Sequence, residues 1–301
     1  MFSKKLLIPL LSLSLLVTPA YSSHAAENAE AAGTSVEGQG MLSPSSSSES
    51  SESVFNGSGA GTSSEPVTDE KLETILKQVQ SQLPAENGTW AVFISDLVNG
   101  TEGSLNDQKM QAASLIKLYI MGAVYENYDQ ITGQYGRDSV DSNLYSMITV
   151  SDNDAANTLT TYLGGGDSAA GMQAVNSFCQ AHGYDQTHMG RMLLASNEND
   201  DNYTSVGDCG HLLQEIYKQD TSSYTHAADM FNLLKAQTRC NKIPAQLPEG
   251  VKTANKTGEL DNVENDAGII YDSKNDVVIV FMSQNLSSAG SAQNTIATLS
   301  R

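Results

Sequence analysis

The chain has 301 residues, of which 16 are Lys or Arg and 35 are Asp or Glu, so its formal net charge is −19. This acidity argues against nucleic acid or an anionic membrane surface as the main partner, because both require clustered positive charge. Eight of the acids lie in residues 27–70, which contain no Lys or Arg, so the charge is unevenly distributed along the chain.

Residues 1–26 predict a secretory signal peptide. Lys4 and Lys5 precede an apolar run over residues 6–17, and small side chains follow up to Ala26. This order is typical of export signals, and the run is shorter than the ~20 residues that a membrane span needs. We therefore expect an exported protein, either secreted, periplasmic or cell-wall associated, with no membrane insertion once the signal is removed.

Residues 27–66 predict a disordered linker. They contain 12 Ser, no Lys or Arg and few large apolar side chains. Such a segment cannot bury enough apolar surface to offset its chain entropy. Two explanations remain open: a spacer that holds the folded part away from a wall or membrane, and a tail that is merely tolerated. The folded domain is expected over residues 67–301.

The first elements of that domain are marked by local signals. Thr68 can cap a helix with acidic residues in its first turn and apolar residues at helical spacing from Leu72 to Leu83. The apolar run from Trp90 to Leu97 predicts a strand, and Asn99-Gly100 predicts the turn of a hairpin.

Strands return near the end of the chain. The runs 268–271 and 277–282 predict two strands joined by a polar turn, and residues 287–300 predict a closing helix. Between these strand-rich ends, residues 113–247 have helical patterns. This order predicts an α/β lobe (67–112 and 248–301) interrupted by an all-helical lobe (113–247).

Cysteines and histidines leave few alternatives for chemistry. Any one pair among Cys179, Cys209 and Cys240 could form a disulfide in an exported chain, or all three could be small buried residues. The histidines of the mature chain have no metal-ligand spacing, so we interpret them as structural; they are His182, His188, His211 and His226.

Three short motifs could carry catalysis. In Ser114-Leu115-Ile116-Lys117, helical spacing would place the lysine beside the serine hydroxyl, which needs a base to become a nucleophile. Ser151-Asp152-Asn153 offers a hydroxyl relay and an amide that bonds a peptide group. Lys256-Thr257-Gly258 offers a cation, a hydroxyl and close backbone approach for a carboxylate. Each motif alone has an ordinary explanation: a helix start, an N-cap and a strand edge.

Together and in this order, the three motifs are the signature set of penicillin-recognising serine enzymes. Over residues 67–301 the chain resembles class A β-lactamases and the related DD-peptidases. The separation of the second and third motifs and the Leu247-Pro248-Glu249-Gly250 segment are also similar to that family. The resemblance implies the β-lactamase/transpeptidase-like α/β (α+β) fold, an antiparallel sheet with flanking helices plus an inserted all-helical lobe.

The resemblance also implies roles for individual residues. Ser114 would be acylated with Lys117 as its base, and Ser151 would pass the proton to the leaving nitrogen. Asn153 would hold the substrate's side-chain amide. The carboxylate would be bound by residues around the third motif, namely Lys256, Thr257, Gly258 and Lys242. The backbone N–H groups of Ser114 and Glu259 would form the oxyanion hole, and neither a metal nor a cofactor is implied.

Departures from the family pattern concern the second half of the reaction. The family activates the deacylating water with a glutamate, and Leu193 stands at that position. Glu198 could replace it only through a different backbone path. Lys242 stands where many members have an arginine, and Glu259 stands where a small residue is usual. We expect acylation to be retained and hydrolysis of the acyl-enzyme to be slow.

The sequence therefore predicts an exported serine hydrolase that forms an acyl-enzyme with β-lactams. One alternative is a DD-carboxypeptidase or transpeptidase that acts on D-Ala-D-Ala ends of peptidoglycan stem peptides. Others are a β-lactam sensor that stays acylated and a wall-associated pseudoenzyme. We expect a monomer whose partner is one of these small molecules or peptides.

Overall fold

The computed structural model describes residues 70–219, 224–271 and 275–301. The predicted signal peptide, the predicted linker and the capping residue Thr68 lie outside these residues. Within them, no helix has both the length and the apolar character needed to cross a membrane.

A five-stranded antiparallel sheet organises the domain, with strand order β2-β1-β7-β6-β5. The strands span Thr89–Asp96 (β1), Thr101–Leu105 (β2), Lys252–Leu260 (β5), Val263–Tyr271 (β6) and Val277–Gln284 (β7). The predicted hairpin turn joins β1 to β2. Asp96 Oδ1 accepts hydrogen bonds from the backbone N–H groups of Val98 and Asn99, and Gly100 follows at a φ of +68°, which glycine adopts without strain.

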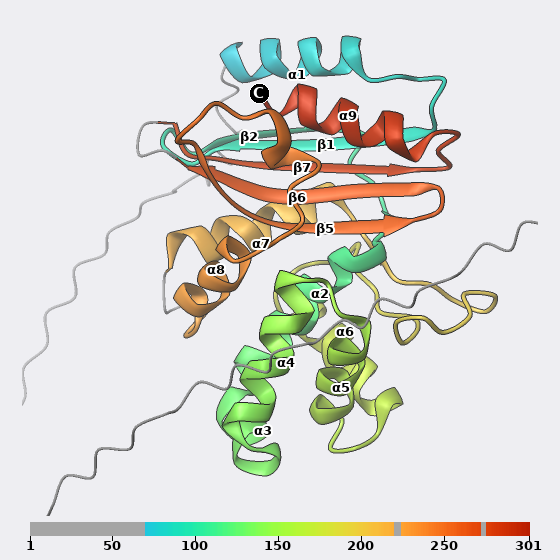
Figure 1. Cartoon of the computed structure of the whole chain (residues 1–301), viewed down its shortest axis with the longest axis vertical. Coiled ribbons are helices and arrows are strands. Elements are labelled where there is room, and N and C mark those ends of the chain that lie inside the picture. Colours follow the sequence, from blue (N-terminus) through green and yellow to red (C-terminus); the bar gives the residue numbers. More distant parts are fainter. Residues whose placement is uncertain (1–69, 220–223, 272–274) are drawn as a thin grey trace, which may run out of the picture. The chain divides into compact units, whose positions relative to one another are not determined.

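Helices cover both faces of the sheet (Figure 1). α1 (Glu70–Gln82) and α9 (Ala289–Leu299) lie on one face. α1 buries Leu72 and Val79 there, the apolar side predicted from its spacing. α7 (Val206–Lys218) packs on the other face against β1, β6 and β7. The chain therefore has the predicted fold class, an antiparallel sheet with flanking helices.

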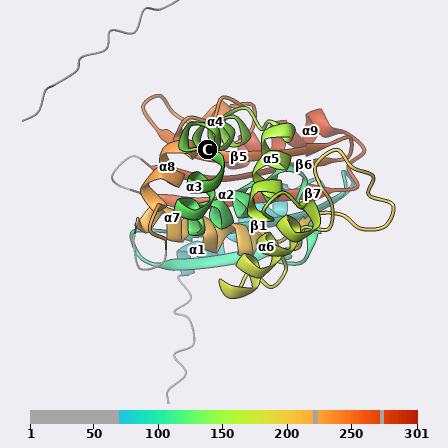
Figure 2. The same cartoon turned by 90° about the horizontal axis from the view of Figure 1, so that it is seen from below.

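The middle of the chain supplies the remaining helices, which lie over the sheet when viewed from below (Figure 2). They are α2 (Ile116–Glu126), α3 (Tyr128–Tyr135), α4 (Arg137–Thr149), α5 (Asn153–Leu163), α6 (Ser168–Ala181) and α8 (Ala227–Lys235). Two short 3-10 helices, η1 (Ala113–Leu115) and η2 (Ile243–Gln246), and a two-stranded sheet of β3 (Met110–Gln111) and β4 (Tyr203–Thr204) complete the described elements.

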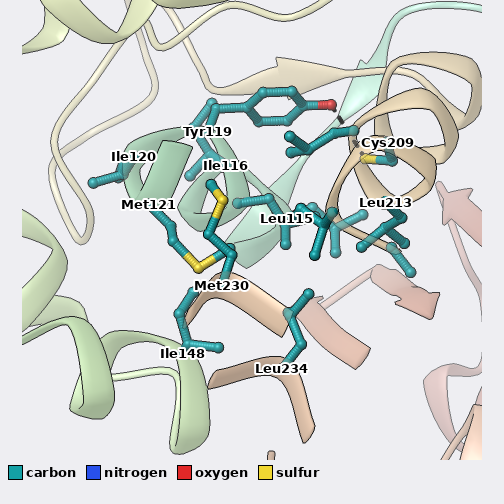
Figure 3. Packing of buried hydrophobic residues seen from close by; sticks show 14 of the residues in the cluster. Leu115, Ile116, Tyr119, Ile120, Met121, Ile148, Cys209, Leu213, Met230 and Leu234 are labelled. Carbon is teal, nitrogen blue, oxygen red and sulfur yellow. Dashed lines mark hydrogen bonds between the residues drawn. The ribbon is translucent and has the colours of Figure 1, made fainter. Parts of the chain in front are cut away.

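α2 lies at the centre of the larger hydrophobic core. Every residue from Ile116 to Val124 is buried, so this helix is enclosed around its whole circumference. Apart from Lys117 the stretch is largely apolar, which is typical of a core helix. Figure 3 shows its side chains among those of α7 and α8, with Tyr119 directed at Cys209 of α7. The Tyr119 hydroxyl donates to Cys209 Sγ at 3.4 Å.

All three cysteines are free thiols in the described residues, so the alternative of a disulfide is not realised. Cys179 and Cys209 are buried, as expected for small apolar residues, whereas Cys240 is exposed. Burial raises the pKa of the Cys209 thiol to about 12, which keeps it protonated at neutral pH. The two buried cysteines therefore act as packing residues.

Replacing Gly122 with alanine should destabilise the fold by about 1–3 kcal/mol, the usual cost of overpacking. A Cβ atom at Gly122 would lie 2.4 Å from the Phe178 ring, and both residues are enclosed by the core. Gly133→Ala in α3 is the matched control, since its Cβ would meet nothing within 4 Å and alanine favours helix by up to about 1 kcal/mol. Urea unfolding measures the free energy of unfolding of both variants. Equal stabilisation of the two would contradict this packing of Gly122 against Phe178.

Candidate active site

Ser114 and Lys117 lie at the point where η1 continues into α2. Lys117 Nζ is 3.1 Å from Ser114 Oγ, so the lysine reaches the hydroxyl, as its spacing on a helix led us to expect. Leu115 and Ile116 between them are fully buried and fix the segment in the core. Ala113 has a φ of +47°, an unfavourable value for a residue with a Cβ atom. Such local strain is common where a reactive side chain must be held in place.

Lys117 is surrounded by oxygen atoms although it is fully buried. Besides Ser114 Oγ, its Nζ lies 2.7 Å from the Ser151 carbonyl oxygen, 3.2 Å from Ser151 Oγ and 2.7 Å from Asn153 Oδ1. These contacts bring the first two sequence motifs together at one amine. Their geometry allows a proton to pass from the Ser114 hydroxyl to Lys117 and from there to the Ser151 hydroxyl.

The electrostatics of Lys117 suit a base. Burial lowers the pKa of Lys117 to about 8, against the opposing charge of Asp152 and with a further contribution from Arg239. With that pKa, about a tenth of the amine is neutral at pH 7. A neutral amine can accept the hydroxyl proton of Ser114, which an ordinary lysine can do only rarely at this pH.

The second motif serves local structure and the site together. Asp152 is the N-cap of α5, and its Oδ1 accepts from the Ala155 N–H at 2.7 Å. Ser151 immediately before it has a φ of +61°, and its hydroxyl faces two lysines. Asn153 is the first residue of α5. The capping interpretation was therefore correct for Asp152, while its two neighbours face the cleft.

Lys256 lies beneath the cleft at the middle of β5. Its side chain is fully buried, and its Nζ donates to Ser151 Oγ at 2.8 Å and to the Thr257 carbonyl at 2.6 Å. Burial, followed by the charges of Lys117 and Arg239, lowers the pKa of Lys256 well below its ordinary value. Ser151 Oγ thus bridges two lysines whose charges disfavour each other, which makes it a suitable proton relay.

Gly258 allows β5 to approach the segment that carries Ser114. A Cβ atom at this position would lie 2.9 Å from the Ala112 carbonyl oxygen and 3.1 Å from the Ser114 nitrogen. Asn265, which pairs with Gly258 across β5 and β6, donates from Nδ2 to the carbonyls of Gln111 and Ala112 at 2.9 and 3.2 Å. The strand and the segment before Ser114 are therefore held together, with Glu259 next along β5.

Lys242 does not lie where the sequence suggested. Its side chain is fully buried, and its Nζ lies 2.6 Å from Glu264 Oε2 and 3.2 Å from Glu259 Oε1. It also donates to the Asn265 carbonyl at 3.0 Å. A buried ammonium group requires such partners, because its desolvation would otherwise be very costly. Lys242 is thus committed to internal acids and not presented to a substrate carboxylate.

Arg239 lies in the cleft instead and was missed from the sequence. It lines a hollow of about 220 Å³ together with Glu259 and side chains from all three motifs. The motif residues in this lining are Ser114, Ser151, Asn153 and Thr257. Its Nη1 lies 3.0 Å from Glu259 Oε2, and 45% of its side chain is exposed. Arg239 is therefore the accessible cation of this hollow. No motif marks it, because its position depends on how residues after α8 pass the sheet.

A larger cleft of about 540 Å³ also includes Ser114 in its lining. Leu193 and its neighbours up to Asn197 line it, whereas Glu198 is not among its lining residues. Asn157 of α5 holds the loop, since its Oδ1 accepts from the Leu193 N–H at 2.8 Å and its Nδ2 donates to the Leu193 carbonyl at 3.0 Å. The loop thus presents the apolar side chain of Leu193 to this cleft.

Comparison with known proteins gives a family match over nearly all of the described chain. The family described as Beta-lactamase enzyme family matches residues 71–139 and 134–301. No curated protein sequence matches the chain.

Solved structures share the fold at low sequence identity. A β-lactamase from Sphaerobacter thermophilus DSM 20745 has a TM-score of 0.64 and 22% identity over 76% of this chain and 95% of its own. PBP-A has a TM-score of 0.66 and 23% identity over 76% and 94% of the two chains. An ancestral class A β-lactamase (GNCA) has a TM-score of 0.65 and 20% identity over 75% and 97%.

Proposed function

Because this chain belongs to the Beta-lactamase enzyme family, we propose that it is an exported serine hydrolase whose Ser114 is acylated by β-lactams and released slowly. The contact that supports acylation best is the 3.1 Å distance between Lys117 Nζ and Ser114 Oγ. We also propose that the mature protein works outside the cytoplasmic membrane, as a monomer.

Acylation would use the groups gathered around Ser114. Neutral Lys117 takes the hydroxyl proton while Ser114 Oγ bonds to the lactam carbonyl carbon, and the carbon–nitrogen bond of the ring then breaks. Lys117 returns a proton through Ser151 Oγ, 3.2 Å away, to the leaving nitrogen. The backbone N–H groups of Ser114 and Glu259 would stabilise the oxyanion, a contribution of about 3 kcal/mol for one donor.

Release of the acyl group from Ser114 would be the slow half of the reaction. A water molecule needs a base in order to attack the ester, and Leu193 offers none in the cleft beside Ser114. Glu259 also lines this cleft, but two cations hold its carboxylate. For PBP-A, an acyl-enzyme complex of a leucine-to-glutamate variant with penicillin G is known, and a persistent acyl-enzyme is the form we propose here.

Slow hydrolysis also favours a second candidate, a DD-carboxypeptidase or transpeptidase acting on D-Ala-D-Ala ends of peptidoglycan. Such an enzyme forms the same ester on Ser114, and the strain of a β-lactam ring is not required. The apolar Leu193 supports this alternative, since the acyl group could await an amine acceptor instead of water. Release of D-Ala from a stem peptide would distinguish it from a sensor that stays acylated.

Mixing the protein of residues 27–301 with penicillin G should add the mass of the intact antibiotic to one site, and Ser114→Ala should remove that addition. Intact-mass spectrometry over time follows both formation and loss of the adduct. Ser81→Ala on the exposed side of α1 is the matched control and should retain it. An adduct of unchanged yield in Ser114→Ala would contradict the proposed nucleophile, and absence of any adduct would refute both enzymatic candidates.

A further inference from the structure

An acidic side chain lies beside the accessible cation of the small hollow, Arg239. Glu259, near the end of β5, lines both the small hollow and the larger cleft together with Ser114. Its Oε2 lies 3.0 Å from Arg239 Nη1 and its Oε1 lies 3.2 Å from Lys242 Nζ. The Glu259 carboxylate therefore forms ion pairs with both cations at once.

The two cations hold Glu259 differently. Lys242 is fully buried and is also paired with Glu264 at 2.6 Å, so it anchors one carboxylate oxygen from below. Arg239 is exposed for 45% of its side chain and binds the other oxygen from the side of solvent. The exposed contact can be exchanged for a contact with another anion, whereas the buried one is fixed by the fold.

A second carboxylate entering this hollow would meet Glu259 at close range. It would have to share Arg239 with an acid that stays bound to Lys242, and two like charges a few ångströms apart repel each other where water is partly excluded. A neutral molecule of the same shape meets no such repulsion. The charge of Glu259 therefore affects one class of acyl donor more than the other.

We propose that Glu259 is a specificity-determining residue that fills the anion position of the cleft and disfavours acyl donors carrying a carboxylate beside the scissile amide, relative to uncharged donors. This inference rests on the proposed acylation of Ser114. It assigns to Glu259 a side-chain role that is separate from its backbone N–H in the oxyanion hole.

The test compares penicillin G with its uncharged methyl ester as acyl donors. The measured quantity is the second-order acylation rate constant of penicillin G divided by that of its methyl ester. Both constants are obtained from the growth of the Ser114 adduct by intact-mass spectrometry. Because the ratio compares two donors on one protein, it is insensitive to a general loss of activity. Glu259→Gln should increase the preference for the free carboxylate by about tenfold, the effect of removing one nearby like charge.

Two further variants make the assignment specific. Glu86→Gln removes an exposed acid between α1 and β1 and should leave the ratio unchanged, since only the total charge is altered. Arg239→Gln should decrease the ratio, because it removes the accessible cation and leaves Glu259 in place. Thermal unfolding verifies that each variant is folded.

The outcomes separate this inference from the proposed function. Adducts with both donors and a ratio that rises only in Glu259→Gln support it. Adducts with a ratio that stays constant or falls in that variant overturn it while leaving the acylation of Ser114 intact; a fall would mean that Glu259 positions Arg239 for the substrate. Absence of an adduct with either donor overturns the proposed function and this inference with it.

Discussion

Replacing Lys117 with alanine is expected to slow acylation of Ser114 by about a thousandfold, within the range for loss of a general base. The side chain is buried with its Nζ 3.1 Å from Ser114 Oγ. Among the lysines of the described residues, it is the one in direct contact with that hydroxyl. Adduct formation with penicillin G, followed by mass spectrometry, measures the loss. Lys77→Ala in α1, which removes an exposed lysine, should acylate normally.

The pH dependence gives an independent check on the same role. Because the pKa of Lys117 is lowered to about 8 and the neutral amine is the active form, acylation should rise about tenfold per pH unit below pH 8 and level off above it. The residual rate of Lys117→Ala should lack this rise. A rate that falls as pH increases through this range, or normal acylation in the variant, would exclude Lys117 as the base.

Leu193→Glu is expected to shorten the lifetime of the penicillin adduct by about a hundredfold, the lower end of what a positioned base contributes. Leu193 lines the cleft beside Ser114, and its backbone is fixed by two hydrogen bonds with the Asn157 side chain, which donates one and accepts the other. The backbone that carries a glutamate at this position would therefore be held in a defined place beside Ser114. The adduct is formed first, free penicillin is removed, and the loss of added mass is then followed.

Leu193→Gln is the control for that experiment, because it has the same shape as the glutamate and also admits water but cannot take up a proton. It should leave the lifetime close to that of the unchanged protein. Equal acceleration in both variants would show that water access limits release. An unchanged lifetime in Leu193→Glu, in a protein that is folded and acylated, would contradict the placement of residue 193 beside the attacking water.

Elements with local signals were predictable, and elements defined by distant partners were not. The turn at Asn99-Gly100 and the apolar side of α1 depend on neighbouring residues, so their patterns were sufficient. β5 has no clear apolar alternation, because its sequence carries Lys256, Thr257 and Gly258. It is a strand because β6 pairs with it, with Lys256 opposite Ala267. The short pair β3 and β4 has even less local signal.

The same division applies to the site. Ser114 and Lys117 are three residues apart, so their contact could be anticipated from helix geometry. Arg239 reaches the cleft only through the packing of distant segments, and Asn265 holds the segment before Ser114 through packing of the same kind. No spacing in the sequence indicates either residue. Lys242 was misplaced for the same reason: its burial depends on Glu264, which is on β6, and no local pattern links the two.

The burial of α2 has a consequence for how this protein can change over evolutionary time. Its residues from Ile116 to Val124 have no position that faces water, and the helix begins two residues after Ser114. The same core holds Lys117 and the segment that carries Ser114, and a change of side-chain volume in a close-packed core is felt by its neighbours. We therefore expect few single substitutions along this helix to be tolerated. Change must come in compensating pairs, such as a larger residue at Gly122 with a smaller one at Phe178. Diversification is left to the rim of the cleft.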